Sequence, residues 1–159
     1  MTDTLFTETV AEMIPTLYRV ACCHLDNEED RKDAVQEALR RGWEKRMTVR
    51  KDEYLKTWVI RILINACRDI SRQRKRVIQT DPASSDQPSG LPEQERMELK
   101  IALMSLPERE RIPVLLFYLE GCDVRQISEI LDIPSGTVKT RLKRGREQLK
   151  AMLKEEVFE

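Results

Sequence analysis

The sequence predicts an all-α protein made of two small helical domains joined by a flexible linker. Apolar residues recur at spacings of three and four along most of the chain, which is the period of amphipathic helices. Charged residues make up 35 % of the 159 residues and aromatic residues only 5 %, which suits short charged helices better than a β-sandwich. Residues 79–94 combine three prolines with serines and a glycine and have no apolar period, so they predict the linker.

The segment before the linker, residues 1–78, predicts a bundle of three or four helices. Its first helix is expected over residues 9–24, with Pro15 marking either the start of the helix or a kink. A second helix follows through residues 34–46, and a polar break separates it from a third. This third helix has apolar residues from Leu55 to Ile70 at spacings of three and four and ends in a basic stretch.

The segment after the linker, residues 95–159, predicts a second bundle that contains a helix-turn-helix. A helix ending at Gly121 is expected to bend at Pro113, which cannot donate a backbone hydrogen bond. A short turn at residues 133–135 then joins one helix to a basic helix from about Gly136 to Glu155. Two helices joined by so short a turn are typical of DNA-binding proteins when the second helix is rich in Lys and Arg.

Two helix starts in this second segment carry capping patterns. Ser105 is expected to be the N-cap of one helix, with Glu108 completing a capping box. Asp123 and Gln126 form a similar pattern at the start of the next helix. Both patterns predict that a side chain satisfies backbone N–H groups that the first turn of a helix leaves without partners.

The charges balance over the whole chain, with 28 basic and 28 acidic residues, but they are unevenly placed. Residues 139–150 hold six basic residues against one acidic residue, and a second basic cluster occupies residues 68–76. A local positive field attracts a polyanion whatever the net charge, so these stripes are compatible with nucleic-acid binding. Two solvated helix faces are the alternative that charge alone leaves open.

Several function classes find no support. No apolar run is long enough to cross a membrane, and the first residues lack the pattern of a signal peptide, so a cytoplasmic protein without membrane insertion is expected. The run Cys22–Cys23–His24 favours buried helical thiols over a metal site, because consecutive helical side chains diverge by about 100° each. With one histidine, no glycine-rich phosphate loop and no nucleophile beside a base, we expect no catalytic residues, no metal and no cofactor.

Three motifs follow one another in a fixed order across residues 10–154: "DAVQEALRRGWE", "LKTWVIRILINACRDISRQRKR" and "LPERERIPVLLFYLEGCDVRQISEILDIPSGTVKTRLKRGREQL". In this combination the chain resembles the extracytoplasmic-function class of bacterial sigma factors in the sigma-70 family. The resemblance implies an all-α, two-domain, non-enzymatic protein that binds core RNA polymerase, directs it to promoter DNA and assists promoter melting. Residues 1–78 would engage the −10 element and the clamp of the largest polymerase subunit, and residues 95–159 the −35 element and the β flap. An anti-sigma factor is a further implied partner.

The resemblance also implies site residues. The −35 element would be contacted by Gly136, Thr137, Lys139, Thr140, Lys143 and Arg144. The −10 element would be contacted by Arg50, Lys51, Trp58, Arg61, Asn65 and Arg68. The polymerase clamp would be bound by Asp33, Gln36 and Glu37. Asn65 matches a family position that holds a flipped-out base, whereas Lys143 stands where the family often has an aromatic or apolar residue. Trp58 is either a stacking platform for DNA or a core tryptophan.

A stand-alone helix-turn-helix regulator is the alternative interpretation. Such a protein would use the first bundle for dimerisation or sensing and would bind a palindromic operator without polymerase. Co-purification with core polymerase separates the two interpretations.

Overall fold

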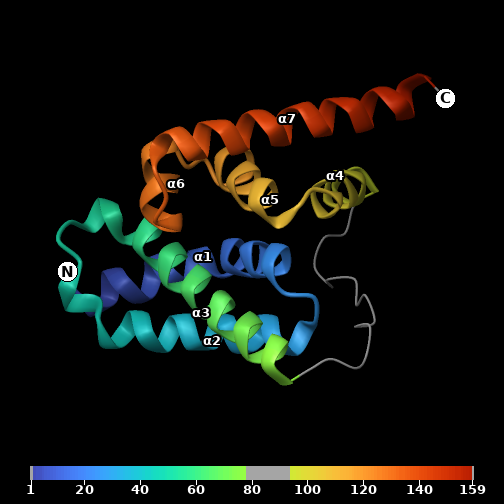
Figure 1. Ribbon diagram of the computed structural model, residues 1–159. Coiled ribbons are helices and arrows are strands. Elements are labelled where there is room, and N and C mark those ends of the chain that lie inside the picture. Colours follow the sequence, from blue (N-terminus) through green and yellow to red (C-terminus); the bar gives the residue numbers. More distant parts are fainter. Residues whose placement is uncertain (1, 78–93, 159) are drawn as a thin grey trace. The chain divides into compact units, whose positions relative to one another are not determined.

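The computed structural model describes the backbone of residues 2–77 and 94–158, and the side chains of residues 2–75 and 100–152. Throughout these ranges the regular elements are helical (Figure 1). The chain divides into two compact units, Met1–Asp86 and Gln87–Glu159. The predicted linker at residues 79–94 lies outside the described residues except for Gln94, which already begins a helix.

Unit 1 is a bundle of three helices: α1 (Asp3–His24), α2 (Glu28–Glu44) and α3 (Leu55–Val77). Between α2 and α3 the chain forms two short 3₁₀ turns, η1 (Arg46–Thr48) and η2 (Asp52–Tyr54). Each helix buries one apolar stripe, and each large side chain so buried contributes about 1.5–3 kcal/mol. The core of the bundle includes Phe6, Val10, Met13, Leu17, Val20, Ala34, Val35, Ala38, Leu55, Val59, Ile60, Leu63, Ile64 and Cys67.

Helix α1 begins six residues earlier than predicted and runs through Pro15 without ending. Of the two alternatives for Pro15, the helix start is therefore wrong. Thr2 caps the helix by accepting a hydrogen bond from the Leu5 N–H (3.1 Å), and the buried Phe6 holds the first turns against the bundle. Pro15 and Ala11 are both exposed, so water can reach the carbonyl whose hydrogen bond the proline removes.

Unit 2 contains α4 (Gln94–Ser105), α5 (Glu108–Val114), a π-helical segment η3 (Leu115–Leu119), α6 (Val124–Leu131) and α7 (Ser135–Phe158). Helix α7 packs against α5 and α6 (Figure 1). The buried apolar side chains include Leu103, Leu106, Ile112, Val114, Leu115, Leu116, Ile127, Ile130, Leu131, Val138 and Leu142. The predicted helix-turn-helix is formed by α6, the turn at residues 132–134 and α7.

The helix around Pro113 widens instead of simply bending. Directly after α5 the backbone adopts π-helical turns, in which the Glu120 N–H donates to the Leu115 carbonyl (3.2 Å). Proline removes one donor from the ladder of hydrogen bonds, and a π segment is a common way for a helix to absorb a local irregularity. Gly121, at φ 71, then ends the segment in a conformation that favours glycine.

The predicted capping box at the start of α5 is wrong. Pro107, not Ser105, stands at the N-cap and makes no side-chain hydrogen bond there. Ser105 instead donates from Oγ to the Ala102 carbonyl at the end of α4 (2.6 Å). The neighbouring carbonyls of Leu103 and Leu106 accept hydrogen bonds from the Arg111 guanidinium. Arg111, in the first turn of α5, therefore stabilises the connection between α4 and α5.

Candidate nucleic-acid interface

The helix-turn-helix of unit 2 is held by local hydrogen bonds. Asp123 and Gln126 form the predicted capping box, with each side chain accepting a hydrogen bond from the other residue's backbone N–H (2.8 and 2.9 Å). Helix α6 ends at Leu131, and its C-cap Asp132 adopts the left-handed conformation at φ 56. The Ser128 hydroxyl donates to the Ile133 carbonyl and so fixes the turn. The start of α7 therefore follows α6 in a defined geometry.

Helix α7 presents a cationic face. Lys139, Thr140, Lys143 and Arg144 are all exposed, while Val138 and Leu142 on the opposite side are buried. The Thr140 hydroxyl donates to the Gly136 carbonyl (3.0 Å), so its proton is used within the helix. The structure thus brings the predicted −35 residues of this helix onto one accessible surface.

The first turn of α7 differs by one residue from the prediction. The helix begins at Ser135, which makes Gly136 and Thr137 its second and third residues. Their N–H groups still lie in the first turn, where they have no intrahelical acceptor. A Cβ placed on Gly136 would have no heavy atom within 4 Å, so the backbone here is open to a ligand.

Helix α3 carries the second set of predicted residues on a face away from its core side. Arg61 and Asn65 are exposed, and Arg68 is half-buried. Trp58 is also half-buried, and its Cζ3 would lie 3.8 Å from a Cβ on Gly42, so its ring packs on α2. Part of the tryptophan therefore belongs to the contact between the helices.

The connection between α2 and α3 gathers exposed apolar and cationic side chains. Met47 is 72 % exposed and Tyr54 50 %, and Arg50 and Lys51 between them are exposed as well. The Lys51 Nζ lies 5.8 Å from the centre of the Tyr54 ring. Proteins that bind single-stranded nucleic acid use aromatic rings beside cations, because bases stack on the rings while the cations contact phosphates.

One arginine of the second basic cluster has a structural partner. Arg74 donates from Nε and Nη2 to the two carboxylate oxygens of Asp30 (2.8 and 3.0 Å), which Asn27 also contacts. The pKa of Arg74 is raised by these bonds. The Asp30 side chain is 11 % exposed, so this pair ties the far end of α3 to the start of α2.

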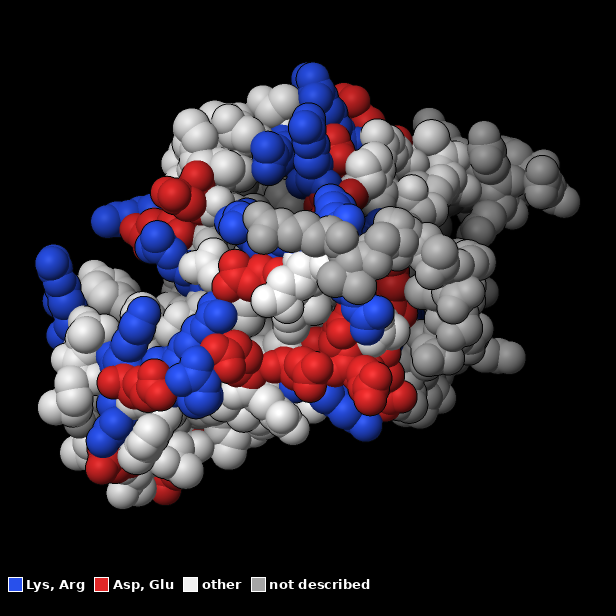
Figure 2. Space-filling model, turned by 60° about the horizontal axis from the view of Figure 1, so that its bottom comes forward, with Lys and Arg blue, Asp and Glu red and all other residues white. Residues whose placement is uncertain are grey.

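The three predicted polymerase-binding residues lie along α2 but differ in their surroundings. Asp33 and Gln36 are exposed. Glu37 accepts hydrogen bonds from Arg40 (3.0 Å) and Arg41 (2.9 Å), and these bonds lower its pKa from 4.5 to about 2. In Figure 2 acidic side chains form a band across the visible face, with Lys and Arg side chains standing beside it.

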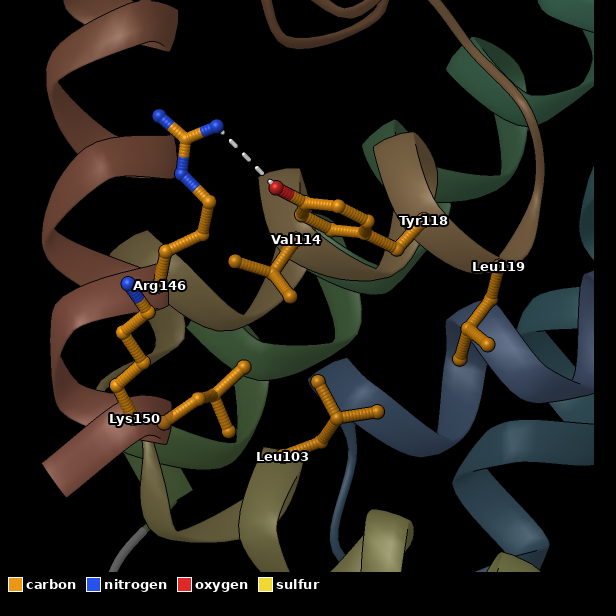
Figure 3. A pocket seen from close by; sticks show the side chains of 7 residues that line it. Leu103, Val114, Tyr118, Leu119, Arg146 and Lys150 are labelled. Carbon is orange, nitrogen blue, oxygen red and sulfur yellow. Dashed lines mark hydrogen bonds between the residues drawn. The ribbon is translucent and has the colours of Figure 1, made fainter. Parts of the chain in front are cut away.

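Unit 2 also has an apolar groove of about 360 Å³. Its lining residues are Leu103, Val114, Tyr118, Leu119, Arg146, Leu149 and Lys150. Two of the lining residues, Tyr118 and Leu119, belong to the π-helical segment and are 49 % and 43 % exposed. The Arg146 guanidinium donates to the Tyr118 hydroxyl (3.3 Å) across one end of the groove (Figure 3).

Known families account for both units. Residues 9–77 match the family described as Sigma-70 region 2, and residues 96–149 match Sigma-70, region 4. The chain belongs to the sigma-70 family. The two matches lie in the same order as the two predicted domains. The region 2 match covers the N-terminal bundle, which the alternative interpretation treats as a dimerisation or sensing domain.

Individual relatives of this sigma factor place it in the extracytoplasmic-function (ECF) class. It is 29 % identical to the RNA polymerase sigma factor SigV of Bacillus subtilis, over 98 % of this chain and 95 % of that protein. It is 28 % identical to the ECF sigma factor SigW of the same organism, over 87 % and 83 %. Its fold matches that of the sigma factor RpoE from Bartonella quintana, crystallised with the anti-sigma factor NepR, with a TM-score of 0.75 and 25 % identity over 94 % and 96 % of the chains.

The sequence did not point to every surface residue of this sigma factor that stands out in the structure. Met47 and Tyr54 are not among the predicted site residues, although two adjacent basic residues within the predicted break and a tyrosine directly after it are a usable signal. The sequence predicts the groove residues Tyr118 and Leu119 as part of the helix that ends at Gly121, and no local signal indicates the π-helical turns. No helix among the described residues is long and apolar enough to span a bilayer, and no cluster within those residues is suited to a metal ion.

Proposed function

We propose that this ECF sigma factor directs core RNA polymerase to promoters through two separate DNA contacts. The α7 face of unit 2 binds the −35 element as a duplex. The α3 face of unit 1, with the connection before it, binds the −10 element and assists its melting. The observation that supports this most strongly is the exposed cationic face of α7, which begins at a fixed helix-turn-helix corner.

The −35 contact divides into phosphate and base contacts. The N–H groups of Gly136 and Thr137 and the positive end of the helix dipole suit a phosphate. Arg144 suits the O6 and N7 atoms of a guanine, which a guanidinium binds with two hydrogen bonds. Lys139, Thr140 and Lys143 lie between these positions and supply further phosphate or base contacts.

The −10 contact combines an amide with cations. The Asn65 side chain both donates and accepts, which suits the edge of a base that has left the stack. Arg61 and Arg68 lie on the same helix face and suit phosphates of the strand. Arg50 and Lys51 extend this surface into the connection, and the exposed part of Trp58 offers a stacking surface beside Asn65.

Polymerase contacts are proposed on a further set of residues in each unit. Asp33, Gln36 and Glu37 on α2 are proposed to bind the clamp of the largest subunit. The apolar groove of unit 2 suits an amphipathic helix of the β flap, with Arg146 and Lys150 meeting acidic residues at its edge. The protein acts in the cytoplasm as a non-catalytic subunit without metal or cofactor.

An anti-sigma factor is proposed as the regulator. The support is the similarity to the Bartonella quintana sigma factor, which was crystallised with the anti-sigma factor NepR. Such a partner would silence the protein by covering surfaces that polymerase needs.

The −35 assignment is tested by Lys139→Ala and Arg144→Ala. Each variant should lower promoter-directed transcription by about 5- to 150-fold, the value of one lost base or phosphate contact. Association with core polymerase should stay unchanged. Arg109→Ala, which removes an exposed arginine of α5, is the matched control and should transcribe like the wild type. Loss of polymerase association by Arg144→Ala would contradict the assignment of α7 to DNA.

The −10 assignment is tested by Asn65→Ala. This variant should bind duplex promoter like the wild type within the holoenzyme but open it poorly, as measured by permanganate reactivity of unpaired thymines. Gln73→Ala removes another exposed side-chain amide from the same helix and should open promoters normally. Normal melting by Asn65→Ala would remove Asn65 from the site.

A further inference from the structure

Arg46 lies at the point where α2 ends and the connection to α3 begins. Its Nε donates to Asp3 Oδ1 (2.8 Å) and its Nη1 donates to the Trp43 carbonyl (2.7 Å). Its guanidinium carbon lies 3.7 Å from the centre of the Trp43 ring. The Arg46 side chain is only 23 % exposed. One side chain thus joins the first turn of α1, the last turn of α2 and the start of the connection.

The residues around Arg46 connect it to the core of the bundle. Trp43 packs on Phe6, with ring centres 5.7 Å apart and planes at 59°, and Phe6 is 4 % exposed. Asp3 is 62 % exposed, so its ion pair alone contributes at most about 1 kcal/mol. The stack on Trp43 and the bond to a helix-terminal carbonyl add to it, and together these contacts fix where the guanidinium lies.

The connection beyond Arg46 is held mainly by local bonds. The N–H groups of Thr48, Val49 and Tyr54 each donate to a carbonyl three residues back. Neither 3₁₀ turn has a side-chain cap. Such bonds shape the chain locally, but they do not fasten it to the bundle. The Arg46–Asp3 pair, in contrast, spans 43 positions of the sequence.

We propose that Arg46 is a positioning residue for −10 recognition, and this inference rests on the function proposed above. By fixing the start of the connection to the bundle, Arg46 holds Arg50, Lys51 and Tyr54 where the unpaired promoter strand passes. A loose connection would have to be ordered during binding, and that loss of conformational freedom lowers affinity. Arg46 itself need not touch DNA.

Lysine cannot replace arginine here. The planar guanidinium donates to two acceptors in fixed directions while it lies flat on an aromatic ring. An ammonium group keeps the charge but loses this geometry. Arg46→Lys therefore separates positioning from electrostatic attraction, because attraction to phosphates depends mainly on the charge.

The test uses holoenzyme made from full-length protein and core polymerase. The probe is the fluorescent non-template strand of a promoter whose start site has been mapped, either with its own −10 sequence or with one base of that sequence replaced. Affinity is measured by anisotropy for the wild type, Arg46→Lys, Asp3→Asn and Lys45→Ala. The last variant removes a neighbouring exposed charge and serves as the control.

Arg46→Lys should bind the correct strand about tenfold more weakly and should discriminate less between the two strands. Asp3→Asn keeps the stack on Trp43. It should also weaken binding of the correct strand and reduce the discrimination, but by less than Arg46→Lys does. Lys45→Ala should keep the wild-type discrimination, and core association should be unchanged in every variant. Asp3→Asn also provides the answer if Arg46→Lys folds poorly.

Wild-type affinity and discrimination in Arg46→Lys and Asp3→Asn would overturn the positioning role while leaving the proposed function in place. A wild-type holoenzyme that does not discriminate between the two strands would instead contradict the proposed −10 contact itself. A parallel loss of affinity for core polymerase in Arg46→Lys would show a general structural defect and would also overturn the inference.

Discussion

At the scale of single residues, two helical glycines have opposite surroundings. A Cβ on Gly145 of α7 would lie 2.5 Å from Val114 Cγ2 and 3.5 Å from Glu110 Cβ, so α5 and α7 approach closely at this point. A Cβ on Gly42 of α2 would lie 3.5 Å from Phe6 and 3.8 Å from Trp58, which is ordinary contact. The sequence did not reveal this difference, because it depends on which helices meet.

Gly145→Ala should destabilise unit 2 by up to about 2 kcal/mol. The extra methyl group overpacks the contact with Val114, which costs about 1–3 kcal/mol, and the better helix propensity of alanine returns about 1 kcal/mol. Gly42→Ala gains the same propensity without the clash and should be at least as stable as the wild type. Denaturant unfolding of the full chain, followed by amide exchange in each unit, measures both. Equal stability of the two variants would contradict the close packing of α5 on α7.

The lowered pKa of Glu37 predicts that the stability of the folded protein depends on pH. Its pKa in the folded protein is about 2, against an ordinary value of 4.5, because Arg40 and Arg41 bind the ionised form. The stabilisation is therefore complete above about pH 4.5 and disappears as the pH falls toward 2. Glu37→Gln should unfold at a lower temperature than the wild type at pH 6, and the difference should vanish near pH 2. A difference that is the same at both pH values would contradict this account.

At the scale of elements, the prediction succeeded where the determining contacts are local. The capping box of α6 follows from residues three apart, and the turn after it from a short polar segment. The predicted start of α5 is wrong, because Pro107 stands at the N-cap. Arg111 donates hydrogen bonds to the carbonyls of the segment before it. The π-helical segment after Pro113 was also missed, since proline patterns predict an interruption but not the form that it takes.

Removing the α6 cap tests this local account. Asp123→Ala should cost about 1 kcal/mol, the usual value of an N-cap, and should speed amide exchange in α6. Ser105→Ala is the control, because the exposed Ser105 caps no helix start in the structure, and it should change stability by less than about 0.5 kcal/mol. A larger loss in Ser105→Ala than in Asp123→Ala would show that the capping box does not hold the helix.

At the scale of the whole molecule, the fold class, the order of the helices and the two-unit organisation followed from helical periodicity and one proline-rich stretch. Contacts between distant residues did not follow. Examples are Asp30 with Arg74, Arg41 with Asp69, and Asp3 with Arg46, in which the partners are separated by 28 to 44 positions. Charge patterns show where charged residues gather, but only the packing of the helices decides which of them form ion pairs.

The central claim is that two separate surfaces of one sigma factor read two promoter elements. Its most direct test is transcription by purified core polymerase and this protein on genomic DNA, with start sites mapped by sequencing. The account predicts discrete start sites preceded by shared −35 and −10 sequences, with Arg144→Ala and Asn65→Ala each weakening initiation at these sites. Start sites no different from those of core polymerase alone, despite binding of the protein to it, would contradict the account.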